Sequence, residues 1–171
     1  MGDPLRPYPR LDGVETNALG ERMIAFFEKY YPHKNELYVT TSLRRGDNGS
    51  YHGGTLFYGG SPTMAVDLGG YDDPEPNDKD QRDMGLASDW LYEHFWDLTV
   101  ELIHTQPHND HSTYVKFQNR VGPYAAADHV NHIHWATSAY LMGLIEARAR
   151  ELWGEGPFFN PTSDEFVGLL I

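Results

Sequence analysis

Two stretches of this sequence lie far apart, yet both carry side chains of the kind that bind metal ions. The first runs from Thr41 to Asp67 and contains His52 as well as the Asp67 carboxylate. The second is the segment 129–135, His-Val-Asn-His-Ile-His-Trp, which contains three imidazoles. One carboxylate and several imidazoles are the ligand set of a zinc site that keeps an open coordination position. A fold that brings both stretches to one point is therefore the strongest constraint on the chain.

The overall composition narrows the classes of function. The chain has no cysteine, so a metal ion must be held by His, Asp or Glu. A net charge of −12 argues against a nucleic-acid-binding protein, which normally needs a basic surface. The same charge disfavours adhesion to anionic membranes or wall polymers. No apolar window approaches the roughly 18 residues of a membrane span, and the N-terminus lacks the apolar region of a secretory signal.

The length of the chain favours one domain. A chain of 171 residues with 40% hydrophobic residues can bury a substantial core. We expect a single domain over 1–171, with an extended arm at 1–13 and a C-terminal tail at 155–171. The sequence shows no internal repeat and no linker long enough to divide it.

Apolar residues at helical spacing predict three helices, which cover 16–31, 83–97 and 138–153. Asp83 is the expected N-cap of the second helix. The acidic segment 71–82 that precedes it is predicted to be an exposed loop.

Strands are predicted where β-branched and aromatic residues gather or alternate with polar ones, namely at 36–42, 63–68, 98–104, 114–121 and 132–136. The segment 98–104 is also compatible with helix, but the turn expected at Pro107 favours strand. We therefore expect an α+β fold in which a small antiparallel sheet carries a zinc site on one face and the helices pack on the other.

Several of the candidate ligands have a physical reason to be in a site. Asp67 closes an apolar run, and a carboxylate buried in such a strand must be paired or bound to a metal. The glycines around His52 allow backbone and substrate to approach closely. His132 and His134 point to the same face of a strand, so both can bind one metal, or one can bind while the other acts on a substrate. His129 can join them if residues 126–131 are helical.

The order of these motifs resembles a known group of enzymes. Ser42-Leu-Arg, Ser50-Tyr-His, Ala65-Val-Asp and His132-x-His resemble the zinc peptidases whose fold is shared by D-alanyl-D-alanine carboxypeptidases, lysostaphin-type endopeptidases and hedgehog domains. More closely, the runs that begin at Glu101, Tyr114 and Ala127 resemble the peptidase domains at the N-termini of actinobacteriophage endolysins, including those of mycobacteriophages. The resemblance covers roughly residues 36–137.

The resemblance implies a particular zinc site. His52, Asp67 and His134 would be the ligands of Zn²⁺, with water in the fourth position and its pKa lowered towards about 7. The gap between His52 and Asp67 is longer than in the carboxypeptidase motif, so residues 54–62 are expected to form an inserted loop.

The resemblance also implies which side chains perform the chemistry. Arg44 would stabilise the charge that develops at the scissile carbonyl. The glutamate that acts as base in the carboxypeptidases falls on Asn131, which cannot accept a proton. The role of base, or of oxyanion stabiliser, therefore passes to His132, with His129 or Asp128 as further candidates.

The expected function follows from these implied roles. The chain would be a zinc metallopeptidase of the D,D- or L,D- type that hydrolyses an amide bond in the stem peptide or cross-link of peptidoglycan. It would be the catalytic domain of a phage endolysin, made in the host cytoplasm without a signal peptide and acting on the cell wall after release. Tyr51 and Trp135 are expected to line the substrate cleft.

Two other classes of protein remain open. One is a zinc-binding module of the same fold without catalysis, as in hedgehog-like domains, which the presence of Asn131 keeps in consideration. The other is an acidic interaction domain that binds no metal and whose histidines are incidental.

Overall fold

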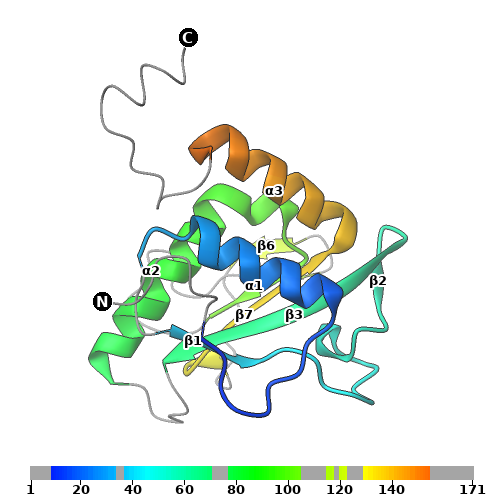
Figure 1. The fold of residues 1–171 in the computed structure, drawn as a ribbon, viewed down its shortest axis with the longest axis horizontal. Helices are drawn as coiled ribbons and strands as arrows, with labels where there is room; N and C mark the ends of the chain where they lie inside the picture. The colour runs from blue at the N-terminus through cyan, green and yellow to red at the C-terminus, as the bar shows by residue number, and fades with distance from the viewer. Residues whose placement is uncertain are drawn as a thin grey trace.

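The structure is a computed structural model that describes residues 9–33, 37–70, 77–104, 115–117, 120–122 and 129–154. These residues form an α+β fold with a small antiparallel sheet and three α-helices (Figure 1). The expected fold class is confirmed in this form. The predictions made for 1–8, 71–76 and 155–171 lie outside the described residues.

The main sheet is built around its longest described strand, β3 (Ser61–Gly70). The strand order is β1-β3-β7-β4, and β2 pairs with the start of β3. All of these pairs are antiparallel. The partners of β3 in this sheet are β1 (Leu37–Thr41), β2 (Phe57–Tyr58) and β7 (Ile133–Ser138), and β4 (Glu101–Ile103) pairs with β7. A separate hairpin consists of β5 (Val115–Phe117) and β6 (Arg120–Gly122).

This sheet matches the predicted strands closely, with two additions. Strand β2 lies within the segment that was expected to loop out. The end of the N-terminal arm also joins the sheet edge, because the backbone of Leu11 donates to the Val39 carbonyl at 3.1 Å and Val39 donates to Pro9 at 2.8 Å.

The three helices are α1 (Ala18–Tyr30), α2 (Asp78–Phe95) and α3 (Ala139–Trp153), and each begins at a polar N-cap. The side chains of Asn17, Asn77 and Ser138 accept hydrogen bonds from backbone N–H groups in the first helical turns, which satisfies donors that the helix itself leaves open. The predicted start of the second helix at Asp83 was wrong. Asn77 is the cap instead, so residues 78–82 are helical and not part of a loop.

The hydrophobic core lies between the sheet and the helices. The indole of Trp135 on β7 packs against Phe26 and Phe27 of α1, with ring centroids 5.8 and 6.5 Å apart. Val66 and Leu68 of β3 belong to the same core. In Figure 1, α1 lies in front of the sheet, and α3 runs beside α1. Because side chains alternate across a strand, Asp67 and His134 face away from this core.

Trp135 therefore cannot take the role expected for it. Its side chain is only 1% exposed, and its neighbours are the aromatic rings of the core. The expectation that it lines a substrate cleft was wrong, because it alternates with His134 and must point to the helical face of the sheet.

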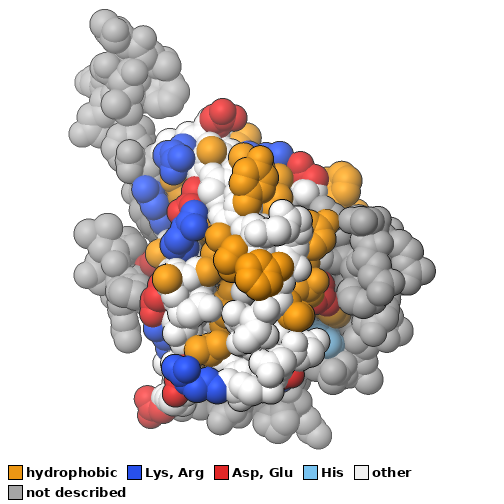
Figure 2. Space-filling view, turned by 90° about the vertical axis from the view of Figure 1, so that its right-hand side faces the viewer, with side chains coloured by type: hydrophobic (Ala, Val, Ile, Leu, Met, Phe, Trp, Pro, Cys, Tyr) orange, Lys and Arg blue, Asp and Glu red, His pale blue; other side chains and the backbone are white. Residues whose placement is uncertain are grey.

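The outer surface mixes charges with single apolar side chains. Figure 2 shows apolar side chains over one face of the molecule, with Lys and Arg interspersed among acidic residues along its edge. The exposed large apolar side chains include Phe57, Trp96 and Tyr140. Within the described residues, no helix is both long enough and apolar enough to cross a membrane.

Candidate metal centre

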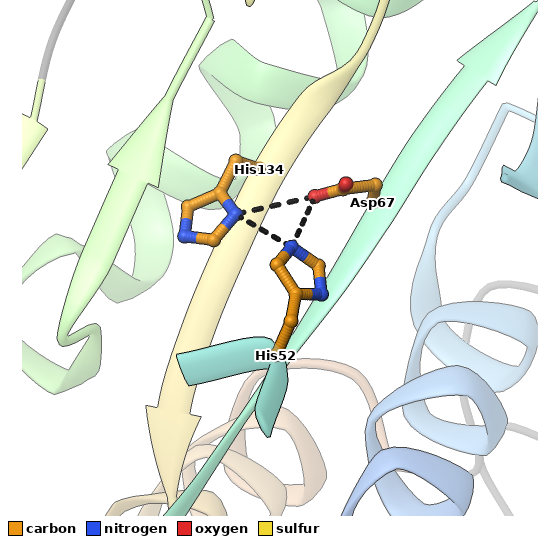
Figure 3. A group of neighbouring side chains, drawn as sticks. All are labelled: His52, Asp67 and His134. Atoms are coloured by element: carbon orange, nitrogen blue, oxygen red, sulfur yellow. Dashed lines mark hydrogen bonds and ion pairs between the residues drawn. The ribbon is translucent and has the colours of Figure 1, made fainter. Parts of the chain in front are cut away.

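Three side chains from different parts of the chain meet on the face of the sheet opposite the core (Figure 3). Asp67 on β3 and His134 on β7 are direct partners in the antiparallel register, so both side chains leave the sheet on the same face. His52 comes from the short 3₁₀ helix η1 (Tyr51–Gly53) and reaches over the two strands. All three side chains are buried, with exposed fractions of 0%, 6% and 7% for His52, Asp67 and His134.

Local backbone contacts position His52. The side chain of Ser50 caps η1 by accepting a hydrogen bond from the His52 amide. The His52 carbonyl in turn accepts from the Arg44 amide at 2.9 Å. A Cβ atom at Gly53 would lie 2.1 Å from the Asp47 carbonyl oxygen, so only glycine fits at that position. The glycine next to His52 thus lets two backbone segments approach each other. The sequence predicted this close approach of the backbone, together with an approach of the substrate.

The ligand atoms form a nearly equilateral triangle. The Nε2 atom of His52 lies 3.1 Å from Oδ1 of Asp67 and 3.1 Å from Nδ1 of His134, and the last two atoms are 3.2 Å apart. A tetrahedral ion bound at about 2.0–2.2 Å separates its ligand atoms by about 3.3–3.6 Å. The triangle needs to open by only a few tenths of an ångström to accept such an ion. His52, Asp67 and His134, which were predicted as ligands, thus form one buried group that could hold a metal ion.

An oxygen on the outer side of each imidazole directs the correct nitrogen inwards. His52 Nδ1 donates to the Ser42 carbonyl at 2.6 Å, which leaves the lone pair of Nε2 facing the centre. His134 turns its Nε2 towards the Glu101 carboxylate, 3.8 Å away, and its Nδ1 towards the centre. Histidines that bind metals usually have such a carbonyl or carboxylate partner on the second nitrogen.

The electrostatics of the centre are those of a tightly coupled group. Burial alone would raise the pKa of Asp67, but its contacts with His134 and then with His52 outweigh burial and hold that pKa below its usual range. Burial lowers the pKa of His134, while Asp67 and Glu101 more than compensate and raise it to about 9. A proton on His134 Nδ1 can therefore be shared with Asp67 and His52. A metal ion would replace this proton, since its ligands must be deprotonated.

Two more histidines lie at the edge of the group. His132 Nε2 is 3.8 Å from Oδ2 of Asp67, the oxygen that does not face the other two ligands. The ring of His129 is 4.8 Å from that of His132 and 5.8 Å from that of His134. Burial lowers the pKa of His132, although the charge of Asp67 acts in the opposite direction. The structure therefore places His132 and His129, two of the three predicted proton-transfer candidates, beside the ligands.

His104 holds the segment that carries these two histidines. It is fully buried, and its Nδ1 donates to the backbone carbonyls of His132 and His129 at 3.0 and 3.2 Å. Burial lowers the pKa of His104 to about 4, even though the two carbonyls favour the charged form. The neutral ring of His104 thus supports the site by holding the backbone of His129 and His132.

Glu101 is a member of the site that was not predicted from the sequence. Its position depends on the register of β4 against β7, in which Ile103 is the partner of His134 and Leu102 is the partner of Trp135. Glu101 shares the face of Ile103, opposite to the core residue Leu102. An acidic residue alternating with buried apolar ones in a strand was the available signal, but only the pairing shows which histidine it meets.

Arg44 and Tyr51 are the remaining predicted residues that the structure describes, and neither is fully buried. The Arg44 side chain is half exposed, and its Nε lies 3.6 Å from the Asp47 carboxylate. Tyr51, next to His52, is partly buried, and its pKa is raised by burial and then by the charge of Glu101. Asp128, the other candidate base, lies outside the described residues.

Comparison of the chain with protein-family models, with curated proteins and with solved structures gave no match. The geometry of the site therefore carries the functional argument.

Proposed function

We propose that this protein is a zinc-dependent peptidase that hydrolyses an amide bond in peptidoglycan peptides, as the catalytic domain of a phage endolysin. The observation that supports the proposal is the buried triangle of His52, Asp67 and His134, which has a fourth titratable side chain, His132, against its edge. A set of three protein ligands with room for water or substrate is typical of catalytic zinc sites, whereas structural sites close with four.

The donor set favours zinc over other common ions. Two imidazoles and one carboxylate suit a borderline ion such as Zn²⁺, whereas Ca²⁺ and Mg²⁺ take mainly oxygen ligands. Zinc bound by His52, Asp67 and His134 would supply Lewis acidity to the scissile carbonyl and lower the pKa of a water molecule.

The protein's own side chains would divide the remaining work. His132 presents Nε2 beside Asp67 and would accept a proton from the attacking water and deliver it to the leaving amine. Arg44, on the exposed side of the loop before His52, would stabilise negative charge on the carbonyl oxygen. Tyr51 would contact the peptide next to the ligands. The net charge of −12 means that recognition of an anionic wall polymer must be local.

The test combines metal analysis with digestion of purified peptidoglycan. The wild-type protein should contain one zinc per chain and release peptide fragments that mass spectrometry assigns to a single cleaved bond. His52→Ala and His134→Ala should lose both the metal and the activity. His33→Ala is the matched control, because His33 is exposed and packs only on Tyr31 among the contacts described. A wild-type protein that contains no stoichiometric zinc would contradict the proposal. Full activity in either ligand variant would also contradict it.

A second candidate is a metal-binding module of the same kind without catalysis. Asn131 favours it, since an amide stands where the carboxypeptidase pattern has its glutamate base. The two functions separate in one experiment: full zinc occupancy with no turnover of any peptidoglycan peptide would favour the module.

A further inference from the structure

Asn131 and His132 are neighbours in sequence, and their side chains also contact each other. Nδ1 of His132 lies 2.8 Å from the amide oxygen of Asn131. An amide oxygen only accepts hydrogen bonds, so Nδ1 of His132 is the nitrogen that carries the proton. In the neutral ring the other nitrogen, Nε2, then has a free lone pair. Nε2 is also the atom that faces Oδ2 of Asp67 at the edge of the metal centre.

The distances show which of the two contacts determines the tautomer. The contact to Asn131 at 2.8 Å is a normal hydrogen bond, whereas 3.8 Å between His132 Nε2 and Asp67 is too long for one. A proton on Nε2 would leave Nδ1 facing the Asn131 oxygen with two lone pairs opposed. The arrangement therefore favours the Nδ1–H form.

The backbone of this segment is held independently of Asn131. His104 donates to the carbonyls of His132 and His129 from the buried side, and His132 leads directly into β7. Asn131 itself is only partly buried. Its side chain thus contributes to the orientation of the His132 ring, and the position of the chain does not depend on it.

We infer that Asn131 is a positioning residue for the proposed hydrolysis, whose amide oxygen holds His132 in the Nδ1–H tautomer and leaves Nε2 able to accept a proton beside the metal ligands. This inference rests on the proposed function. It gives Asn131 a role other than that of a lost glutamate base. The group that accepts the proton is the next residue along the chain, and Asn131 orients it, as outer hydrogen-bond partners do for catalytic imidazoles.

The tautomer can be measured directly in the full chain loaded with zinc. Long-range ¹H–¹⁵N correlations of protein labelled with ¹⁵N-histidine at pH 7.5, with His132 assigned by its absence in His132→Gln, report which ring nitrogen carries the proton. The wild type should show a protonated Nδ1 and an unprotonated Nε2. Asn131→Ala should populate the Nε2–H form. With peptidoglycan peptide as substrate, its kcat should fall by about tenfold or more, while KM and zinc content stay unchanged.

Asn131→Asp is the matched variant, because it keeps an acceptor oxygen at the same place. It should retain the Nδ1–H tautomer that Asn131→Ala loses. A wild-type ring protonated on Nε2, or a tautomer that Asn131→Ala leaves unchanged, would overturn the inference. The tautomer measurement needs no turnover. An inactive protein with the expected tautomers would therefore refute the proposed hydrolysis while supporting the contact between Asn131 and His132 as the cause of the tautomer.

Discussion

Replacement of His104 by asparagine should remove much of the acid sensitivity of this protein. His104 is fully buried, and burial lowers its pKa to about 4, whereas the same ring in an unfolded chain titrates near its ordinary value of about 6.5. Below pH 6.5 the unfolded chain binds a proton that the native protein does not accept until about pH 4. The stability contributed by neutral His104 is thus present above pH 6.5 and is lost as the pH falls towards 4.

Proton linkage gives the size of this effect. The free energy of unfolding should fall by about 2 kcal/mol between pH 7.5 and pH 5 from His104 alone, and by about 3 kcal/mol once the pH is below both pKa values. Asparagine keeps an N–H donor close to the place of Nδ1 but has no proton to titrate. His104→Asn should therefore be less stable than the wild type at pH 7.5, yet lose about 2 kcal/mol less on acidification.

The assay is urea unfolding followed by tryptophan fluorescence at pH 7.5 and 5.0, with a chelator present so that release of metal does not contribute to the pH dependence. His33→Asn serves as the control, since His33 is exposed. Between pH 7.5 and 5.0 this variant should lose as much free energy of unfolding as the wild type does. If His104→Asn loses the same free energy as the wild type between the two pH values, burial of a neutral imidazole at this position is not the cause of acid sensitivity.

Three further predictions concern the metal, a helix start and the core. Glu101→Gln should weaken zinc binding by about 10–100-fold, because the carboxylate that orients His134 is removed; a chelator competition titration measures this, and unchanged affinity would show that Glu101 has no such role. Asn77→Ala should cost about 1 kcal/mol of stability in urea unfolding because it removes the N-cap of α2, whereas Asp83→Ala should cost less. A larger loss in Asp83→Ala would indicate that Asp83 is the N-cap. Trp135→Ala should lower stability by about 3–5 kcal/mol, measured in the same way. A small loss of stability together with weaker substrate binding would indicate instead that Trp135 lines the cleft.

Addition of metal should also stabilise the folded protein. A ligand that binds only the native state adds about 2.7 kcal/mol at a free concentration of 100 times its dissociation constant. Thermal unfolding with zinc and with excess chelator should therefore differ in midpoint, and the difference should disappear in His134→Ala. A midpoint that does not respond to chelator would argue for the acidic domain without metal that the sequence also allowed.

The sequence by itself determined the helices and most strands, and its resemblance to the zinc peptidases indicated the three candidate ligands. Local spacing is sufficient for the helices and strands, since their periodicity shows which residues face a core. Asp67 stands out because a carboxylate that closes an apolar run needs a partner or a metal ion once it is buried. Even so, the start of α2 was misplaced, because Asn77 and Asp83 are both good caps and the sequence does not show which one the helix uses.

Only the tertiary structure decided how the centre is completed. Asp67 meets His134 because β3 and β7 pair in one register, and a shift of one residue between these strands would leave the two side chains on opposite faces of the sheet. The same pairing sends Trp135 to the helices. The register of β4 against β7 brings Glu101 to the outer nitrogen of His134, and His104, which follows β4, contacts the carbonyls of His129 and His132. These contacts join residues that are distant in the chain. They arise from strand pairing and packing, which local sequence patterns do not specify.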